Sequence, residues 1–276
     1  MSRRPNTHLT RVSTAGKPEA SPGVRSGVRS GGPRYARGVA RAPDTHGTDD
    51  YLEAVYEMHE EGFPVLQARL AERLGVSRAT VSEKVGRLVS MKLLEVGDER
   101  QIDLTAHGRS VAEDAVRRHR MAERFLIDVL KLPWHKAHEE AERFQDAISG
   151  EIEERIMAIL GEAATCPHGN PIPGTGATIP ADLVSLDEMS AGDEAELIRL
   201  TEDVELHTDV LRYFEEHGLM PGHRVRVVEV APDGTMTLES DGVKSSLGPE
   251  IADNMWMRRG KPRSGSSGGR RADARR

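Results

Sequence analysis

Residues 66–90 constrain the fold of this chain more than any other segment. Leu66, Leu70 and Leu74 recur at the spacing of one helix face, and Gly75 then interrupts the pattern. A second helical pattern, SRATVSEKVGRLVSMKLL, begins at Ser77, a residue type that caps the start of helices. Two short helices joined by so tight a turn predict a helix-turn-helix.

The segments on either side of this motif complete a small domain. A helical pattern that opens near Thr48 precedes it, and two short apolar segments follow it, at Leu94–Val96 and Gln101–Leu104. Polar turn residues separate these two segments, as in a β-hairpin. This order of elements predicts a winged helix-turn-helix domain over residues 47–107.

The second helix of the motif carries side chains of the kinds that contact DNA. The first turn of this helix reaches base edges in such folds, and Arg78, Lys84 and Arg87 are expected to bind phosphate groups. Hydroxyl and carboxylate side chains read bases or pack against thymine methyl groups. The alternative is an ordinary helix pair with a solvated, charged face. The candidate DNA-binding residues are Gln67, Ser77, Arg78, Ala79, Thr80, Ser82, Glu83, Lys84 and Arg87.

Two longer helices are expected after the hairpin, in a domain that spans residues 108–164. The first ends near Leu132-Pro133, where proline stops the pattern. The second is expected over HKAHEEAERFQDAISGEIEERIMAIL. Apolar residues at three-four spacing form a seam there, for another helix or another subunit. The seam consists of Trp134, Ala137, Ala141, Phe144 and Ile148.

The segment after residue 164 is predicted to be mostly non-helical. Residues 165–182 are rich in proline and glycine and are predicted to be a linker without regular structure. Residues 183–257 contain a short helix at Thr208–His217 and alternating segments around Pro232-Asp233-Gly234, a pattern typical of a small β-barrel. The expected fold class is therefore mainly α with a small β part.

Charge and composition exclude several classes of protein. Residues 1–46 and 258–276 are rich in arginine, glycine and serine and are predicted to be disordered basic tails, although the whole chain has a net charge of -7. No apolar run approaches the ~20 residues that cross a bilayer, which excludes an integral membrane protein and favours the cytoplasm. The single cysteine, Cys166, excludes a disulfide scaffold and a cysteine-based zinc module.

Three of the expected helices carry acidic or imidazole side chains at one-turn spacing, so each set lies on one helix face. Helical bundles build metal sites from such faces. Carboxylates with a minority of imidazole and no thiolate favour the harder divalent ions, here Mn2+ or Fe2+. Taken singly, each residue also has an ordinary interpretation as a solvated charge or a helix-dipole partner. The sets are Asp50 and Glu53; His119 and Glu123; and His138, Glu142, Gln145 and Asp146.

The ordered motifs resemble the diphtheria toxin repressor and manganese transport regulator (DtxR/MntR) family over residues 47–257. The resemblance implies a winged helix-turn-helix, a helical metal-binding and dimerisation domain, and a C-terminal FeoA-like, SH3-like barrel. The motifs that carry it are DYLEAVYE, ARLAERLGVSRATVSEKVGRL, VRRHRMAERFL, HEEAERF, PHGNPIPG and LRYFEEHGLMPGHRVRVV.

The resemblance also implies two metal sites. Gln145 and Asp146 stand where the family usually has Glu and His, so the first site is altered here. Its mapped ligands are Asp50, Glu53, His119, Glu142, Gln145 and Asp146. For the second, ancillary site, His119, Glu123 and His138 match, and His207 falls near a barrel position usually held by Glu.

The function implied is that of a cytoplasmic, homodimeric DNA-binding transcriptional repressor. It would take Mn2+ or Fe2+ as co-repressor, bind double-stranded operator DNA and control metal-homeostasis genes. The alternative is a winged-helix regulator that no longer responds to metal. An enzyme is not expected, because the chain contains neither a nucleophile motif nor a glycine-rich phosphate loop.

Overall fold

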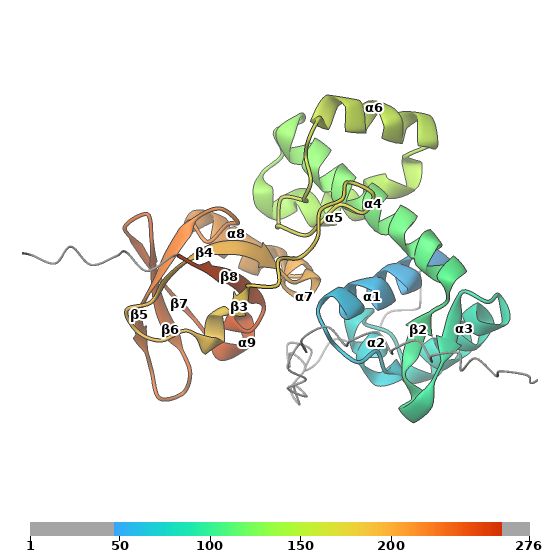
Figure 1. Cartoon of the computed structure of the whole chain (residues 1–276), viewed down its shortest axis with the longest axis horizontal. Coiled ribbons are helices and arrows are strands. Elements are labelled where there is room, and N and C mark those ends of the chain that lie inside the picture. The colour runs from blue at the N-terminus through green and yellow to red at the C-terminus, as the bar shows by residue number, and fades with distance from the viewer. Residues whose placement is uncertain (1–46, 261–276) are drawn as a thin grey trace, which may run out of the picture. The chain divides into compact units, whose positions relative to one another are not determined.

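The computed structural model describes residues 47–260 and confirms a mainly helical fold with a small β part (Figure 1). The basic tail predicted for residues 1–46 lies outside the described residues, as do residues 261–276 of the C-terminal one. Arg258 and Arg259, which were expected in that tail, are instead the last residues of a strand. None of the helices between residues 47 and 260 is long and apolar enough to cross a membrane.

The N-terminal part is a winged helix-turn-helix. Leu52, Leu70 and Leu88, one from each helix, are completely buried in a single core. The third helix starts where it does because the Ser77 hydroxyl accepts a hydrogen bond from the Thr80 amide at 3.0 Å. The elements are α1 (Thr48–Glu60), α2 (Gln67–Arg73), α3 (Arg78–Ser90), β1 (Leu94–Val96), the 3-10 turn η1 (Asp98–Arg100) and β2 (Ile102–Leu104).

The central part consists of one long helix and two shorter ones. The prediction of a single helix between His135 and Leu160 is wrong. Ile148 adopts an extended conformation, and Ser149 caps a new helix. Serine competes with the helix by bonding to local backbone groups, so it favours a cap over the helix interior. The elements are α4 (Ala106–Asp128), η2 (Trp134–Lys136), α5 (Ala137–Phe144), η3 (Gln145–Ala147) and α6 (Gly150–Leu160).

The apolar seam is filled by elements of the same chain. Ala141 and Ile148 pack in a core with Met121 of α4, and the ring of Phe144 stacks against that of Phe125 with centroids 6.2 Å apart. Trp134, the first seam residue, belongs to the core of the C-terminal domain. The seam therefore joins helices within this chain.

The C-terminal part is built on a six-stranded antiparallel sheet with the order β3-β8-β4-β5-β6-β7. Alternate residues such as Leu197, Val227 and Leu238 face its core. The elements are β3 (Val184–Ser185), η4 (Leu186–Glu188), β4 (Glu194–Leu200), α7 (Glu202–Glu205), α8 (Thr208–Glu216), β5 (Arg224–Val230), β6 (Met236–Ser240), β7 (Val243–Leu247), α9 (Pro249–Ala252) and β8 (Met255–Arg259).

The proline- and glycine-rich segment before β3 contains no helix, as expected, but it is not a solvated linker. Cys166, His168 and Asn170 are buried, and the Leu200 amide donates to the carbonyl of His168 at 2.9 Å. Gly169 has a φ of +92°, and a Cβ there would lie 2.0 Å from the carbonyl oxygen of Ile198. Only glycine allows this turn, residues 165–172, to pack so closely against β4.

Two helical glycines provide a test of the packing. A Cβ at Gly108 would lie 1.8 Å from the carbonyl oxygen of Leu93, whereas nothing lies within 4 Å of one at Gly86. We expect Gly108→Ala to destabilise the chain by about 1–3 kcal/mol and Gly86→Ala to stabilise it by about 0.5–1 kcal/mol. Urea unfolding followed by circular dichroism measures both. Similar effects of the two substitutions would contradict this packing.

Candidate metal centre and DNA-binding surface

Four buried side chains form a compact set of potential metal ligands, the inner cluster. Glu123, Cys166, His168 and Glu205 each offer one ligand atom, and these atoms all lie within 4.8 Å of one another. They come from α4, from the turn 165–172 and from α7. Three parts of the chain that are distant in sequence therefore meet at one point.

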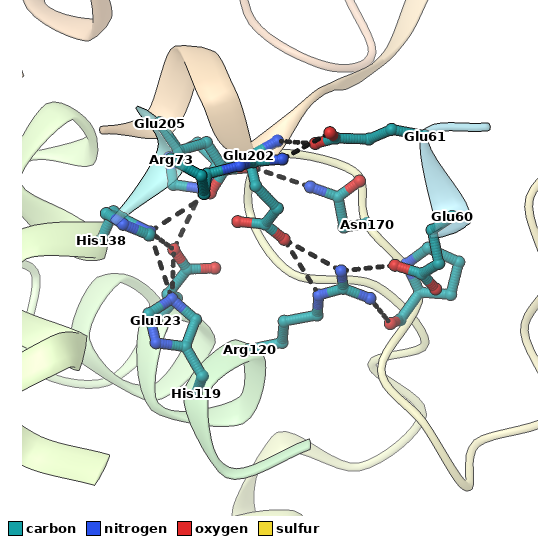
Figure 2. Close-up of polar contacts among 12 residues, drawn as sticks. Glu60, Glu61, Arg73, His119, Arg120, Glu123, His138, Asn170, Glu202 and Glu205 are labelled. Carbon is teal, nitrogen blue, oxygen red and sulfur yellow. Dashed lines mark hydrogen bonds and ion pairs between the residues drawn. The ribbon is translucent and has the colours of Figure 1, made fainter. Parts of the chain in front are cut away.

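A second group, His119, His138 and Glu202, adjoins the inner cluster and meets the same distance limit. His119 Nε2 lies 3.2 Å from His138 Nδ1, and His138 Nδ1 lies 3.4 Å from Glu123 Oε1. Figure 2 shows these imidazoles directed at the Glu123 carboxylate, with Glu205 on the far side. The two groups make one continuous buried network.

Local structure explains how these side chains converge. His119 and Glu123 are four residues apart on α4 and so share a helix face. Glu202 and Glu205 begin and end the single turn of α7. His168 is held by its own backbone contact to β4, and its ring packs edge-on against Trp134 at 4.7 Å.

Oppositely charged side chains lie in close contact within the inner cluster. His168 Nδ1 lies 2.7 Å from Glu205 Oε2 and 3.2 Å from Glu123 Oε1. Burial favours neutral imidazole, but these two carboxylates outweigh it and raise the pKa of His168 well above its usual value. Burial by itself raises the pKa of Glu123, yet His168, followed by His119 and His138, holds that pKa well below its usual range.

Burial opposes the ionisation of two other groups of the network. Burial, followed by the charge of Glu202, raises the pKa of Glu205 to about 7. Burial, followed by the charges of Glu123 and Glu205, raises the pKa of the Cys166 thiol to about 12. The network therefore favours positive charge at its centre, which a bound cation supplies.

Orphaned polar atoms support the same conclusion. Oε2 of Glu123 and Nε2 of His168 are buried without a hydrogen-bond partner, whereas Oε1 of Glu123, Nδ1 of His168 and Oε2 of Glu205 contact one another as ion pairs. Buried polar atoms nearly always have a partner, because leaving one unsatisfied costs free energy. The residues fit a divalent transition metal. The structure also places the Cys166 thiol among these donors, and the ligand set predicted from the sequence does not include it.

An outer cleft of about 120 Å³ lies beside this network, and residues of α1, α2, α5 and α7 line it, Arg73 and Glu202 among them. Asp50, Glu53 and Glu142 line it together with His138. Glu53 is buried with Oε1 unpartnered, and its desolvation raises its pKa to about 7. Asp50 also accepts a hydrogen bond from the Gly47 amide at 2.9 Å, which ties it to the start of α1.

The structure separates the remaining predicted ligands. Gln145 is buried, and its Oε1 lies 3.0 Å from His119 Nδ1. Asp146 is exposed on η3 and does not line the cleft. His207 is half-buried just before α8, and Glu205 rather than His207 represents the C-terminal domain in the inner cluster.

Sequence reasoning missed four members of the network: Cys166, His168, Glu202 and Glu205. A signal was present, because Cys166 and His168 are two residues apart and Glu202 and Glu205 share one helical turn. The prolines and glycines around His168 indicated a linker instead. The turn acquires its role only by packing against β4.

Some of the predicted DNA-binding residues are exposed on the helix-turn-helix, and the others are partly buried in contacts within the domain. The hydroxyls of Ser77 and Thr80 lie 2.8 Å apart and stabilise the start of α3, while Lys84 packs over the ring of Tyr51 at 5.3 Å. Gln67 is half-buried at the first position of α2. The exposed members on α3 are Arg78, Ala79, Ser82, Glu83 and Arg87.

Three family models match this chain in succession. "Iron dependent repressor, N-terminal DNA binding domain" covers residues 45–102, and "Iron dependent repressor, metal binding and dimerisation domain" covers residues 105–174. The FeoA domain covers residues 184–259. Together they define a repressor architecture with separate DNA-binding, metal-binding and FeoA domains.

Similar individual proteins are repressors of the same kind by name. The iron-dependent repressor IdeR of Mycobacterium tuberculosis is 39% identical over 206 residues, 71% of this chain and 89% of that protein. The diphtheria toxin repressor of Corynebacterium diphtheriae is 33% identical over 213 residues, 74% and 93% respectively. A manganese-dependent transcriptional repressor in complex with manganese is 32% identical, with a TM-score of 0.68, over 77% of this chain and 100% of that one. The chain belongs to the iron-dependent, or diphtheria toxin, repressor family.

The cluster geometry gives a direct prediction for His168. His168→Ala is expected to weaken Mn2+ or Fe2+ binding by about tenfold or more, because it removes one of four convergent donors. His223→Ala is the matched control, since His223 pairs with Asp241 in the C-terminal domain at 2.9 Å. Calorimetric titration without DNA, anaerobic for Fe2+, measures both. Native affinity in His168→Ala would remove His168 from the ligand set.

Proposed function

We propose that this chain is a metal-dependent transcriptional repressor that binds double-stranded operator DNA as a cytoplasmic homodimer. Fe2+ or Mn2+ is its co-repressor, and its targets are metal-homeostasis genes. The observation that carries the proposal is the buried donor network, which joins the metal-binding and FeoA domains of a chain whose N-terminal domain is a winged helix-turn-helix. The names of its relatives, iron-dependent and manganese-dependent repressors, support the same function.

The inner cluster is the proposed centre of metal binding. Glu123, Cys166, His168 and Glu205 would hold the ion, with His119 and His138 beside them. A bound cation would replace the imidazole protons as the positive charge beside the buried carboxylates. The outer cleft, with Asp50, Glu53 and Glu142, is the second candidate, and through it α1 would respond to metal.

The donor set favours Fe2+ over Mn2+. A thiolate is a soft ligand, and Fe2+ binds nitrogen and sulfur donors more tightly than Mn2+ does. The outer cleft, lined largely by carboxylates, has the harder character that suits Mn2+. The inner cluster therefore supports an iron preference, and the cleft keeps manganese within the proposal.

A homodimer is supported by apolar side chains that this chain leaves exposed on α6. Ile159 is 62% exposed and Ile152 is 42% exposed, and Leu130, just beyond α4, is 59% exposed. Exposed apolar residues grouped on one helix are typical of an interface. Two copies joined in this region would present two copies of α3 to successive turns of the DNA.

Metal control of DNA affinity is the central prediction. Adding Mn2+ or anaerobic Fe2+ is expected to tighten binding to the chain's own promoter at least tenfold, about 1.4 kcal/mol. Fluorescence anisotropy measures this against a chelator control. Glu142→Ala, which removes a carboxylate from the outer cleft, is expected to abolish the effect. Equal binding with and without chelator would favour a winged-helix regulator that does not respond to metal.

Replacement of the thiol tests the metal preference. Cys166→Ser is expected to lower Fe2+ affinity by a larger factor than Mn2+ affinity, because a hydroxyl is a harder donor than a thiolate. Paired calorimetric titrations of the native chain and the variant provide the comparison. An equal loss for the two ions would mean that the sulfur atom does not set the preference.

A further inference from the structure

Helix α7 connects the buried donor network to the DNA-binding domain within its single turn. Glu205, at its end, belongs to the inner cluster. Glu202 and Asp203, at its start, contact residues of α2, α4 and the end of α1. Because only one helical turn separates Glu202 from Glu205, a displacement of one moves the other.

The contacts at the start of α7 reach the helix-turn-helix itself. The amide of Glu202 donates to Glu61 Oε1 at 3.0 Å, immediately after α1. The other carboxylate oxygen of Glu61 is paired with the guanidinium of Arg73, the last residue of α2 (Figure 2). Arg73 Nε also lies 3.9 Å from Asp203 Oδ1. Glu61 and Arg73 thus form a bridge between α7 and the helix that supports α3.

Burial gives this bridge a defined geometry. The side chains of Glu61 and Arg73 are 1% and 8% exposed, so solvent screens their attraction far less than it screens a surface pair. Arg73 is only five residues before Arg78, the first residue of α3. A change in its position is passed directly to the recognition helix.

Arg120 of α4 makes a second set of contacts between α7, the end of α1 and the turn 165–172. Its guanidinium contacts Glu202 at 2.9 Å, Glu60 at 2.6 Å and the carbonyl of Pro171 at 2.7 Å. Arg120 is fully buried, so removing it would strand several charges and test folding rather than coupling. Substitutions in the bridge of Glu61 and Arg73 therefore test the coupling more specifically than a substitution of Arg120 does.

We propose that Glu61 and Arg73 are positioning residues through which the FeoA domain transmits metal occupancy of the inner cluster to the recognition helix. This inference rests on the proposed function. In it the FeoA domain both supplies Glu205 to the cluster and holds α2, so metal-loaded protein presents α3 in a fixed position. His168 and Asn170 each contact Glu205 at 2.7 Å, and a metal bond to Glu205 would restrain it further. In this proposal the bridge contributes less to DNA affinity when that bond is absent.

The test uses the full chain and the double variant Glu61→Gln, Arg73→Gln, which removes both charges of the buried pair together. DNA affinity is measured by anisotropy on the chain's own promoter, with chelator and with saturating Mn2+. We expect unchanged affinity with chelator, while the metal-induced gain falls from tenfold or more to below about threefold. Arg73→Lys, which keeps the charge, is expected to restore most of the gain. Arg143→Gln, which removes an exposed ion pair on α5, is the matched control.

Hydrogen exchange provides a second readout that does not depend on DNA. Metal is expected to protect the amides of α2 and α3 in the native chain and not in the double variant. A double variant that keeps the full metal-induced gain overturns the inference while the proposed function stands. A native chain without any gain overturns the proposed function itself. Weaker DNA binding with chelator as well as with metal would show that the bridge merely supports the fold, and that too overturns the inference.

Discussion

Three imidazoles converge on one carboxylate oxygen in the interior of this protein. Oε1 of Glu123 lies 3.4 Å from His119 Nε2, 3.4 Å from His138 Nδ1 and 3.2 Å from His168 Nδ1. A buried carboxylate is costly unless cations or hydrogen bonds compensate it. Two helices and one turn must therefore stay in place around Glu123, and this requirement organises the centre of the molecule.

The long helix α4 links this centre to the other domains. It presents His119 and Glu123 to the cluster, and Arg120, between them in sequence, to the carboxylates of Glu60 and Glu202. Charges that belong to the DNA-binding and FeoA domains are thus compensated within a few residues of the candidate metal ligands. Metal binding at this network, as proposed, would share its free energy with the arrangement of the domains.

Local sequence patterns predicted most of the fold. Ser77 capped α3, Gly75 ended the supporting helix, and the hairpin fell where the apolar segments indicated it. The break after Phe144 was missed, because the apolar spacing continues through it while the backbone at Ile148 does not. For the candidate site, one-turn spacing selected His119, Glu123 and His138, which the structure brings together.

The sequence by itself determined the winged helix-turn-helix, the helix faces that carry candidate ligands, and the family. Only the tertiary structure decided that Cys166, His168 and Glu205 complete the cluster and that His207 does not. The physical reason is that a helix face follows from local periodicity, whereas a turn becomes part of a site through contacts distant in sequence. The close approach of Gly169 to the carbonyl of Ile198 is such a contact, and it places His168 beside Glu205.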